Sequence, residues 1–253
     1  MTLLEAVSVR RSQRTYLPRP LEGDQLDQLG KALAECNRRA GLGVRLVCPA
    51  GSVFAGQGRL ESARGCLLFA GPAEDPDLEE KCGYWGEELI LTAVSMGLGT
   101  CWVGGTYDRR ACQARLEPGE TLVCAAALGI PEGSPAPRAL RPAGELALPA
   151  DCAPAWFGAG IAAVQQAPSA MNRQGYRFQL QAGGTVLARL TGGGAFAMVD
   201  LGIAKRHFQL GAHGGTWTWG DGGVFRKAAE EKSCGAVIWR PAGDGREYLL
   251  ARH

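Results

Sequence analysis

The sequence predicts a mixed fold of helices and strands, either α/β or α+β, organised as two halves with a common order of elements. In the first half, compact apolar runs typical of strands are separated by segments with helical periodicity. After residue 153 the chain starts again with a helix, a strand pair, a second long helix, a glycine-rich loop and a tryptophan-containing strand. The second half repeats the pattern of the first but hardly its identities, which indicates a diverged internal duplication.

The segment from Lys81 to Gly105 is predicted to be a buried helix that leads into a strand. No charged residue occurs between Glu88 and Asp108, and apolar side chains fall on more than one helical face, as in a core helix. Gly97 and Gly99 are expected to end the helix. They also leave the apolar run too short to span a membrane, which needs about 20 helical residues.

The remaining elements follow from periodicity, turn residues and apolar runs. Helices are expected over residues 2–9, 24–36, 108–117, 156–166 and 196–210, and strands over residues 44–48, 65–70, 100–103, 120–130, 176–180, 185–190 and 216–219. Residues 51–58 and 167–174 are expected to form loops, and residues 131–153, rich in proline and alanine, an arm or linker.

Composition and charge exclude several classes of function. The net charge is +2 and the Lys and Arg residues are scattered, so nucleic acid is not an expected partner. Nine cysteines without a CxxC pair indicate reduced thiols in a cytoplasm. The three histidines are not spaced like metal ligands, so we expect no metal site. Because the N-terminus lacks the apolar core of a signal peptide, we expect a cytoplasmic protein without a membrane segment.

A cluster of basic residues follows the first predicted helix. Arg10, Arg11, Ser12 and Arg14 place three guanidinium groups and a hydroxyl within five residues. Arginine forks match phosphate oxygens bidentately and a serine hydroxyl adds a short hydrogen bond, so the cluster suits a phosphate. Taken alone, an arginine-rich pentapeptide is more often a solvated surface, and this alternative stays open at this point.

With these elements placed, residues 1–225 resemble the FMN-dependent nitroreductase family, and most closely its subgroup in which one chain holds two half-domains. The resemblance implies an α+β fold with mainly antiparallel sheets covered by helices. It depends on three motifs, which are Arg10-Arg11-Ser12-x-Arg14, Gly83-Tyr84 with the run from Gly97 to Gly105, and Pro168-Ser169-Ala170-x-Asn172-x-Gln174.

The resemblance also implies how FMN is held. The first motif would grip the phosphate and ribityl chain, with Arg14 reaching the flavin pyrimidine edge and tuning the flavin. The end of the central segment would lie against the isoalloxazine ring, and the third motif would complete the site as a crossing loop. Two further arginines, Arg141 and, less favoured, Arg138, would close on the phosphate. The expected cofactor residues are Arg10, Arg11, Ser12, Arg14, Trp102, Val103, Gly104, Gly105, Arg138, Arg141, Pro168, Ser169, Ala170, Asn172 and Gln174.

Several reactive or aromatic residues near these motifs are expected to pack rather than to react. Cys101 is more typical of a buried cysteine that behaves as a small hydrophobe than of a redox thiol. Trp85 and Trp102 are expected in the core rather than stacked on a ligand. Lys205 and His207, on the second long helix, are expected to be packed or solvated.

The motifs are divided between the halves. Each half carries one motif of a complete site, whereas a homodimeric member of the family would repeat both. We therefore expect residues 1–150 and 151–225 to form an internal pseudodimer with a single shared FMN, as a monomer or a weak homodimer. A flavin-to-protein ratio near two would contradict this expectation.

The implied activity is the transfer of hydride from NAD(P)H through FMN to an electron-poor small molecule, such as a nitro compound or a quinone. No side chain needs to act as a nucleophile, and Arg14 would stabilise the anionic reduced flavin. Two alternatives remain at this point. One is a flavin-binding module without turnover, such as a sensor or a partner-bound domain, and the other is a scaffold that binds no flavin.

The C-terminal residues 226–253 depart from the family. Residues 232–239 and 246–252 alternate like two strands around a turn, and they resemble the opening strands of a Nudix hydrolase domain. The Nudix box that would hold catalytic magnesium does not follow, so no pyrophosphate hydrolysis is expected.

Overall fold

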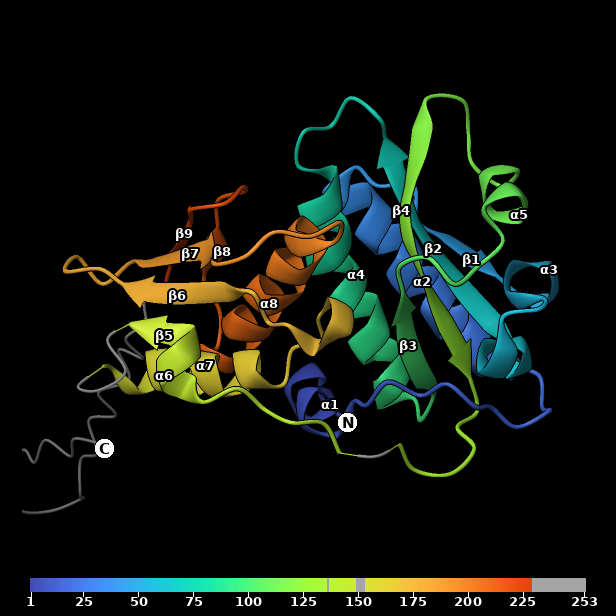
Figure 1. Cartoon of the computed structure of the whole chain (residues 1–253), viewed down its shortest axis with the longest axis horizontal. Helices are drawn as coiled ribbons and strands as arrows, with labels where there is room; N and C mark the ends of the chain where they lie inside the picture. Colours follow the sequence, from blue (N-terminus) through green and yellow to red (C-terminus); the bar gives the residue numbers. More distant parts are fainter. Residues whose placement is uncertain (136, 149–152, 229–253) are drawn as a thin grey trace, which may run out of the picture.

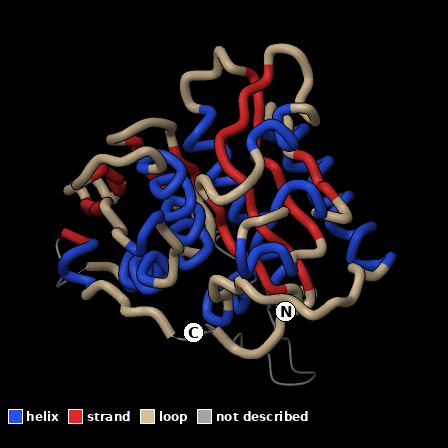
Figure 2. Tube along the Cα trace, turned by 45° about the vertical axis from the view of Figure 1, so that its right-hand side comes forward, coloured by secondary structure: helices blue, strands red, loops and turns tan. Residues whose placement is uncertain are grey.

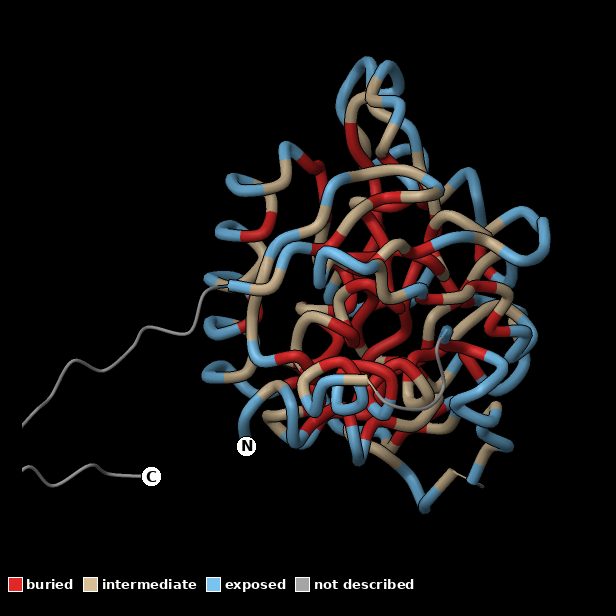
Figure 3. Tube along the Cα trace, turned by 90° about the vertical axis from the view of Figure 1, so that its left-hand side faces the viewer, coloured by how far each residue is buried: buried red, intermediate tan, exposed pale blue. Residues whose placement is uncertain are grey.

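The computed structural model describes residues 1–135, 137–148 and 153–228. Two groups of strands lie on opposite sides of a pair of long helices, α4 (Leu78–Ser95) and α8 (Ala197–Gly211) (Figure 1). The buried residues gather in the middle of the molecule (Figure 3). The predicted C-terminal hairpin over residues 232–252 lies outside the described residues.

The first sheet is antiparallel throughout, with the strand order β1-β2-β4-β3. Its strands are β1 (Arg45–Val47), β2 (Gly65–Pro72), β3 (Gly99–Val103) and β4 (Glu120–Gly129). One face packs on α2 (Gly23–Ala40) and α4, and the other on α3 (Gly51–Phe54), the 3-10 helix η1 (Gly58–Ser62) and α5 (Arg109–Gln113) (Figure 2). Covering on both faces explains why β2 is a continuous apolar run.

The second sheet has the order β5-β6-β7-β9-β8 and is antiparallel except between β5 and β6. Its strands are β5 (Ala147–Leu148), β6 (Tyr176–Leu180), β7 (Val186–Leu190), β8 (Thr216–Trp217) and β9 (Gly223–Arg226). Phe178, Trp217 and Phe225 from the sheet surround Phe208 of α8, with ring centroids 5.1–5.6 Å from that of Phe208. The aromatic cluster therefore joins this sheet to the central helices.

All the long elements match the sequence prediction, and the elements that were not predicted are short. The helix α1 (Leu3–Val9), with its Thr2–Glu5 capping box, α2, α4, α5, α7 (Ala155–Gln165) and α8 lie where helices were expected. The helices α3 and η1 replace a predicted loop, and α6 (Ala143–Leu146), β5 and β9 were not predicted. These elements have two to five residues, so tertiary contacts rather than a periodic pattern define them.

The helices α4 and α8 cross with their backbones in contact. A Cβ atom on Gly83 would lie 2.1 Å from the Val199 carbonyl oxygen, and one on Gly202 would lie 2.1 Å from the Glu80 carbonyl oxygen. Beside this crossing, the buried Lys205 ammonium pairs with the Glu80 carboxylate. The reciprocal glycines thus set how closely the two halves approach.

Replacing Gly202 with Ala should destabilise the protein by about 1–3 kcal/mol, because the added methyl group must push one helix backbone away from the other. Chemical denaturation would measure the loss. The control is Gly30→Ala in α2, where a Cβ meets no atom within 4 Å. That substitution should stabilise the helix by up to about 1 kcal/mol. Equal stability of the Gly202 variant and the parent would contradict the close crossing.

Candidate functional site

Two adjoining cavities lie between the N-terminal segment and the second half. The polar cavity, of about 710 Å³, is lined by residues that include five arginines, namely Arg10, Arg11, Arg14, Arg59 and Arg138, with Glu132 as its carboxylate. The apolar cavity, of about 420 Å³, is lined mainly by Leu60, the strand end Cys101–Thr106, Phe196, Val199 and Ile203. Ser12, Arg14, Pro168, Ser169 and Met171 border both. The first and third sequence motifs therefore meet where the cavities join.

Arg10 is a buried cation without a hydrogen-bond partner. Its side chain lines the polar cavity with 1% exposure, and none of its three guanidinium nitrogens forms a hydrogen bond within the described chain. Burial lowers its pKa, and the Glu87 carboxylate, 3.8 Å from Nε, opposes that effect. A buried guanidinium with unused donors is destabilising unless an anion binds it.

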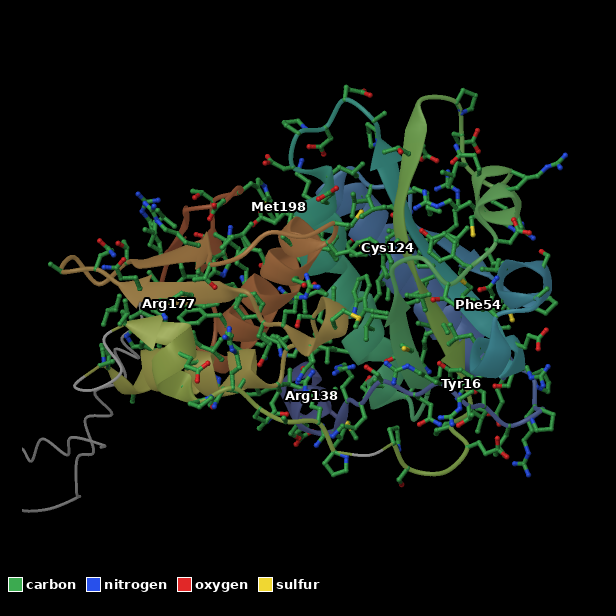
Figure 4. The ribbon with its side chains drawn as sticks, viewed as in Figure 1. Tyr16, Phe54, Cys124, Arg138, Arg177 and Met198 are labelled. Carbon is green, nitrogen blue, oxygen red and sulfur yellow. The ribbon has the colours of Figure 1, made fainter. Side chains whose placement is uncertain are left out.

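Arg138 brings a second guanidinium to the same cavity. Burial, reinforced by the nearby charge of Arg10, lowers its pKa to about 10. Its Nη2 donates a long hydrogen bond of 3.4 Å to the Gln165 carbonyl, while Nε has no partner in the described residues. In Figure 4, Arg138 lies beside α1, at whose end Arg10 is the cap residue. The neighbouring positive charges of Arg10 and Arg138 favour the binding of a multiply charged anion in this cavity.

Arg141 does not line the polar cavity, whereas Arg138 does. The sequence-based preference for Arg141 over Arg138 stays a prediction, and this placement does not favour it. Its Nη1 donates to the Gln174 carbonyl at 2.8 Å, and its Nε lies 3.1 Å from a Glu145 carboxylate oxygen. It lines a third cavity, of about 410 Å³, whose wall is the glycine run 192–194. The chain between the two arginines is not helical, so their spacing gave no information on which one faces inward.

The arginine motif is fixed to the first sheet by its backbone. Ser12 forms a parallel bridge with Thr100 of β3, and Gln13 N donates to the Thr100 carbonyl at 2.8 Å. The buried Gln13 amide donates to the Glu132 carbonyl at 2.9 Å. These contacts hold the segment whose residues Arg11, Ser12 and Arg14 line the cavities.

The loop at residues 168–174 has an unusual backbone. Met171, Asn172 and Gln174 have φ values of 54°, 54° and 46°, in the left-handed region that costs other residues than glycine about 1–3 kcal/mol each. Ser169 Oγ accepts the Gln174 N–H at 2.8 Å, and Asn172 Nδ2 donates to the Ala139 carbonyl at 3.1 Å. Pro168, Ser169 and Asn172 line the polar cavity, and Ala170 lines the apolar one.

Gln174 shapes this loop instead of lining a cavity. It is fully buried, and its side-chain amide donates to the carbonyl oxygens of Val164, Gln165 and Ala167 at 3.1–3.3 Å. The expected direct contact of Gln174 with a cofactor is therefore corrected to a supporting role.

The apolar cavity is a slot between the end of β3 and α8. Trp102, Val103, Gly104 and Gly105 line it at the end of β3, and Phe196 lines it at the start of α8. A Cβ on Gly104 would lie 2.4 Å from the Phe196 ring, so only glycine permits this approach. Trp102 stacks on Phe69 with ring centroids 4.4 Å apart, which agrees with its expected packing role.

Glu87 on α4 contacts side chains of three other elements beside the site, and no sequence motif pointed to it. Its Oε2 accepts the Trp102 Nε1–H at 2.7 Å, and its Oε1 lies 2.9 Å from His207 Nε2. His207 Nδ1 donates to the Ala163 carbonyl at 3.0 Å, because a carbonyl only accepts. A proton must then lie between His207 Nε2 and Glu87 Oε1, since two acceptors would repel. His207 is thus packed and paired.

Asp200 stands in the first turn of α8 and lines both the apolar and the glycine-walled cavities. Both carboxylate oxygens accept the Ala170 N–H, at 2.9 and 3.0 Å. Burial raises its pKa to about 6, although the Ala170 hydrogen bond and the charge of Arg173 act in the opposite direction. This titratable group was not predicted from the sequence.

The described part of the chain contains neither a metal site nor a helix that could span a membrane. Among the described residues, no group of three or more His, Cys, Asp or Glu side chains could hold a metal ion. Within the same part of the chain, no helix is both long and apolar enough to cross a bilayer. The cysteines described are all free thiols, and burial raises the pKa of Cys101.

Comparison with known proteins agrees with the resemblance seen in the sequence. The model of the family described as "Putative TM nitroreductase" matches residues 2–212. The crystal structure of a putative nitroreductase from Thermotoga maritima MSB8 aligns with 89% of this chain and 92% of its own, at 20% identity and a TM-score of 0.64. The shared fold confirms the predicted nitroreductase-like α+β architecture.

Partial matches cover the shorter nitroreductases. A putative nitroreductase in complex with FMN, from Desulfovibrio desulfuricans, aligns with 57% of this chain and 94% of its own at 19% identity and a TM-score of 0.47. Nitroreductase A from Vibrio parahaemolyticus RIMD 2210633 aligns with 57% and 74% at 20% identity, also with a TM-score of 0.47. No curated protein sequence matches.

Substituting Glu87 with Gln should destabilise the protein by about 3–5 kcal/mol, because Arg10 and His207 would lose the carboxylate that neutralises them in the interior. Urea unfolding followed by tryptophan fluorescence would measure the loss. The neighbouring Glu88→Gln is the control, since Glu88 pairs with Arg206 at 2.7 Å in a partly exposed position. That change should cost no more than about 1 kcal/mol. Similar losses in the two variants would show that Glu87 is not the centre of the network.

Proposed function

The chain belongs to the family described as putative TM nitroreductase, and we propose that it is an FMN-dependent oxidoreductase that uses NAD(P)H to reduce an electron-poor acceptor such as a nitro compound or a quinone. The observation that supports the proposal most directly is the buried guanidinium of Arg10 at the polar cavity, whose nitrogens have no hydrogen-bond partner among the described residues. This guanidinium can bind an anion, and the polar cavity adjoins the apolar cavity. FMN carries a phosphate at one end and a flat ring at the other, so the phosphate would occupy the polar cavity and the ring the apolar one.

The residues present fit the chemical groups of FMN. Arg10 and Arg138 supply the paired positive charge that a phosphate dianion requires, and guanidinium donors bind phosphate oxygens strongly. Arg11, Ser12 and Asn172 add donors along the same cavity for the phosphate and the ribityl hydroxyls. The apolar cavity, lined by Leu60, Val103 and Ile203 together with Phe196, offers the aromatic and aliphatic surface suited to the isoalloxazine ring.

The chain's own residues position charge and exclude water, while FMN, when bound, supplies the two-electron chemistry. Arg14 borders both cavities, where its guanidinium would stabilise negative charge on the pyrimidine edge of the ring. Elements of both halves line the apolar cavity, so a bound ring would displace water from it and the electrostatic effect of Arg14 would be strengthened.

A single shared site is part of the proposal. Arg10 and Arg14 come from residues 1–150, whereas the loop 168–172 and Phe196 come from residues 151–225. This division supports an internal pseudodimer with one FMN, working as a monomer or a weak homodimer. The cytoplasmic location inferred from the scattered cysteines remains a prediction.

The purified protein should show the visible absorbance of oxidised flavin, either as isolated or after FMN is added. Anaerobic NADH or NADPH should bleach it, and a nitroaromatic or quinone should restore it. Flavin that neither nucleotide bleaches would favour a flavin-binding module without turnover. A protein that takes up no FMN would contradict the assignment of the arginine motif.

Replacing Arg138 with Gln should weaken FMN binding by about 10- to 100-fold, the equivalent of one lost charge-assisted hydrogen bond. The same variant without FMN should be more stable than the parent, since a buried like charge beside Arg10 is removed. Calorimetric titration and thermal melting would test both effects. Arg141→Gln is the matched control and should leave FMN affinity within about twofold, the range of a surface change. Equal weakening by both substitutions would return Arg141 to the phosphate site.

A further inference from the structure

We propose that Asp200 is a catalytic residue that donates a proton to the acceptor during its reduction. The proposal rests on the oxidoreductase function proposed above and adds a residue that the sequence motifs do not contain. It is based on where the carboxyl group lies, on its hydrogen bonds and on the chemistry that a two-electron acceptor requires.

The position of Asp200 is the first observation. Its side chain borders the apolar cavity assigned to the ring and also the glycine-walled cavity beside it. Ala170, Met171 and Phe196 line both cavities as well, so Asp200 lies where the two meet. An acceptor that enters beside the ring would contact this junction.

The hydrogen bonding of Asp200 leaves it able to carry a proton. A single N–H, that of Ala170, is shared by both carboxylate oxygens, whereas a carboxylate can accept about four hydrogen bonds. The other ionisable groups acting on Asp200 or influenced by it are Arg173, Cys124 of β4 and Tyr176 of β6. Among these, Arg173 alone opposes the raised pKa, and it is an exposed side chain.

Other ionisable groups lining the apolar cavity are poor proton donors at neutral pH. Arg14 holds its protons, since a guanidinium is not deprotonated in proteins. Burial raises the pKa of the Cys101 and Cys124 thiols, which makes them still weaker acids. With a pKa of about 6, Asp200 is the group closest to the operating range of a general acid.

The proton balance defines the step. A quinone that receives a hydride, two electrons and one proton, from the reduced flavin needs a second proton to become a hydroquinone. In the proposed step the O–H bond of the Asp200 carboxyl breaks while an O–H bond forms on the acceptor oxygen. The resulting carboxylate regains its proton from solvent through the open glycine-walled cavity.

The test compares an acceptor that needs protons with one that does not. Asp200→Asn keeps an oxygen that can accept the Ala170 N–H but removes the transferable proton. At pH 5.5 it should lower kcat/KM for a benzoquinone by about 100-fold, a typical effect of losing a general acid. Reduction of ferricyanide, a one-electron acceptor that takes up no proton, should change by less than about threefold, as should FMN affinity.

The pH profile gives a second measure. The parent's kcat/KM for benzoquinone should fall about tenfold per pH unit above the pKa of Asp200, and the variant's profile should be flat there. Asp221→Asn is the matched control, because Asp221 accepts the Leu190 N–H at 2.8 Å and lines none of the three cavities. It should retain the parent's profile.

Stability supplies a readout that does not depend on turnover. The folded pKa of Asp200 lies above its ordinary value of 3.8, so the stability it contributes is fully present below 3.8 and is lost as pH rises from there through about 6. Asp200→Asn should therefore melt higher than the parent at pH 8, and the difference should disappear as pH falls below 3.8. No difference at pH 8 would overturn the titration on which the proposal depends.

The remaining outcomes separate the two proposals. Equal losses with benzoquinone, ferricyanide and FMN affinity would show that Asp200 only anchors the loop, and an unchanged benzoquinone rate would remove its role altogether. A parent protein that binds no FMN or reduces neither acceptor would instead refute the proposed function, and the role of Asp200 with it.

Discussion

The arrangement of this molecule depends on the burial of one carboxylate, that of Glu87, between its two halves. A buried charge is tolerated only when it is paired and hydrogen-bonded. Glu87 on α4 is 0% exposed and meets Arg10 at the end of α1, Trp102 on β3 and His207 on α8. Each partner comes from a different element, so satisfying one carboxylate fixes four elements relative to one another. The close crossing of α4 and α8 at Gly83 and Gly202 allows His207 on α8 to reach Glu87 on α4.

The positive charge of Arg10 and Arg138 at the polar cavity indicates where an anionic ligand would bind. Glu87 and His207 share a proton, so the pair compensates Arg10 only in part, and Arg138 adds further positive charge. The left-handed residues of the 168–174 loop and the half-buried carboxyl of Asp200 are also locally unfavourable at the same place. Strained backbone and unfavourable charges that gather around one cavity, in a protein that is otherwise well packed, are typical of a functional site.

The sequence predicted those features that a local pattern encodes. The strand β2 and the helix end at Gly97, with φ of 82°, each follow from a few neighbouring residues. The Arg/Ser and Pro-Ser motifs located both walls of the cavities. The roles of Glu87 and Asp200 were not predicted, because their partners are distant in the sequence. The crossing of α4 and α8 brings these partners together. The choice between Arg138 and Arg141 depended on the path of an irregular segment, which spacing does not encode.

The central claim is that one chain builds one complete flavin site from its two halves. The most direct measurement is a calorimetric titration of FMN into flavin-free protein, with the molar mass of the same sample determined by light scattering. The account predicts one FMN per chain of 26.7 kDa, whether the particle is a monomer or a weak homodimer. Two FMN per chain, or one FMN per two chains, would contradict it.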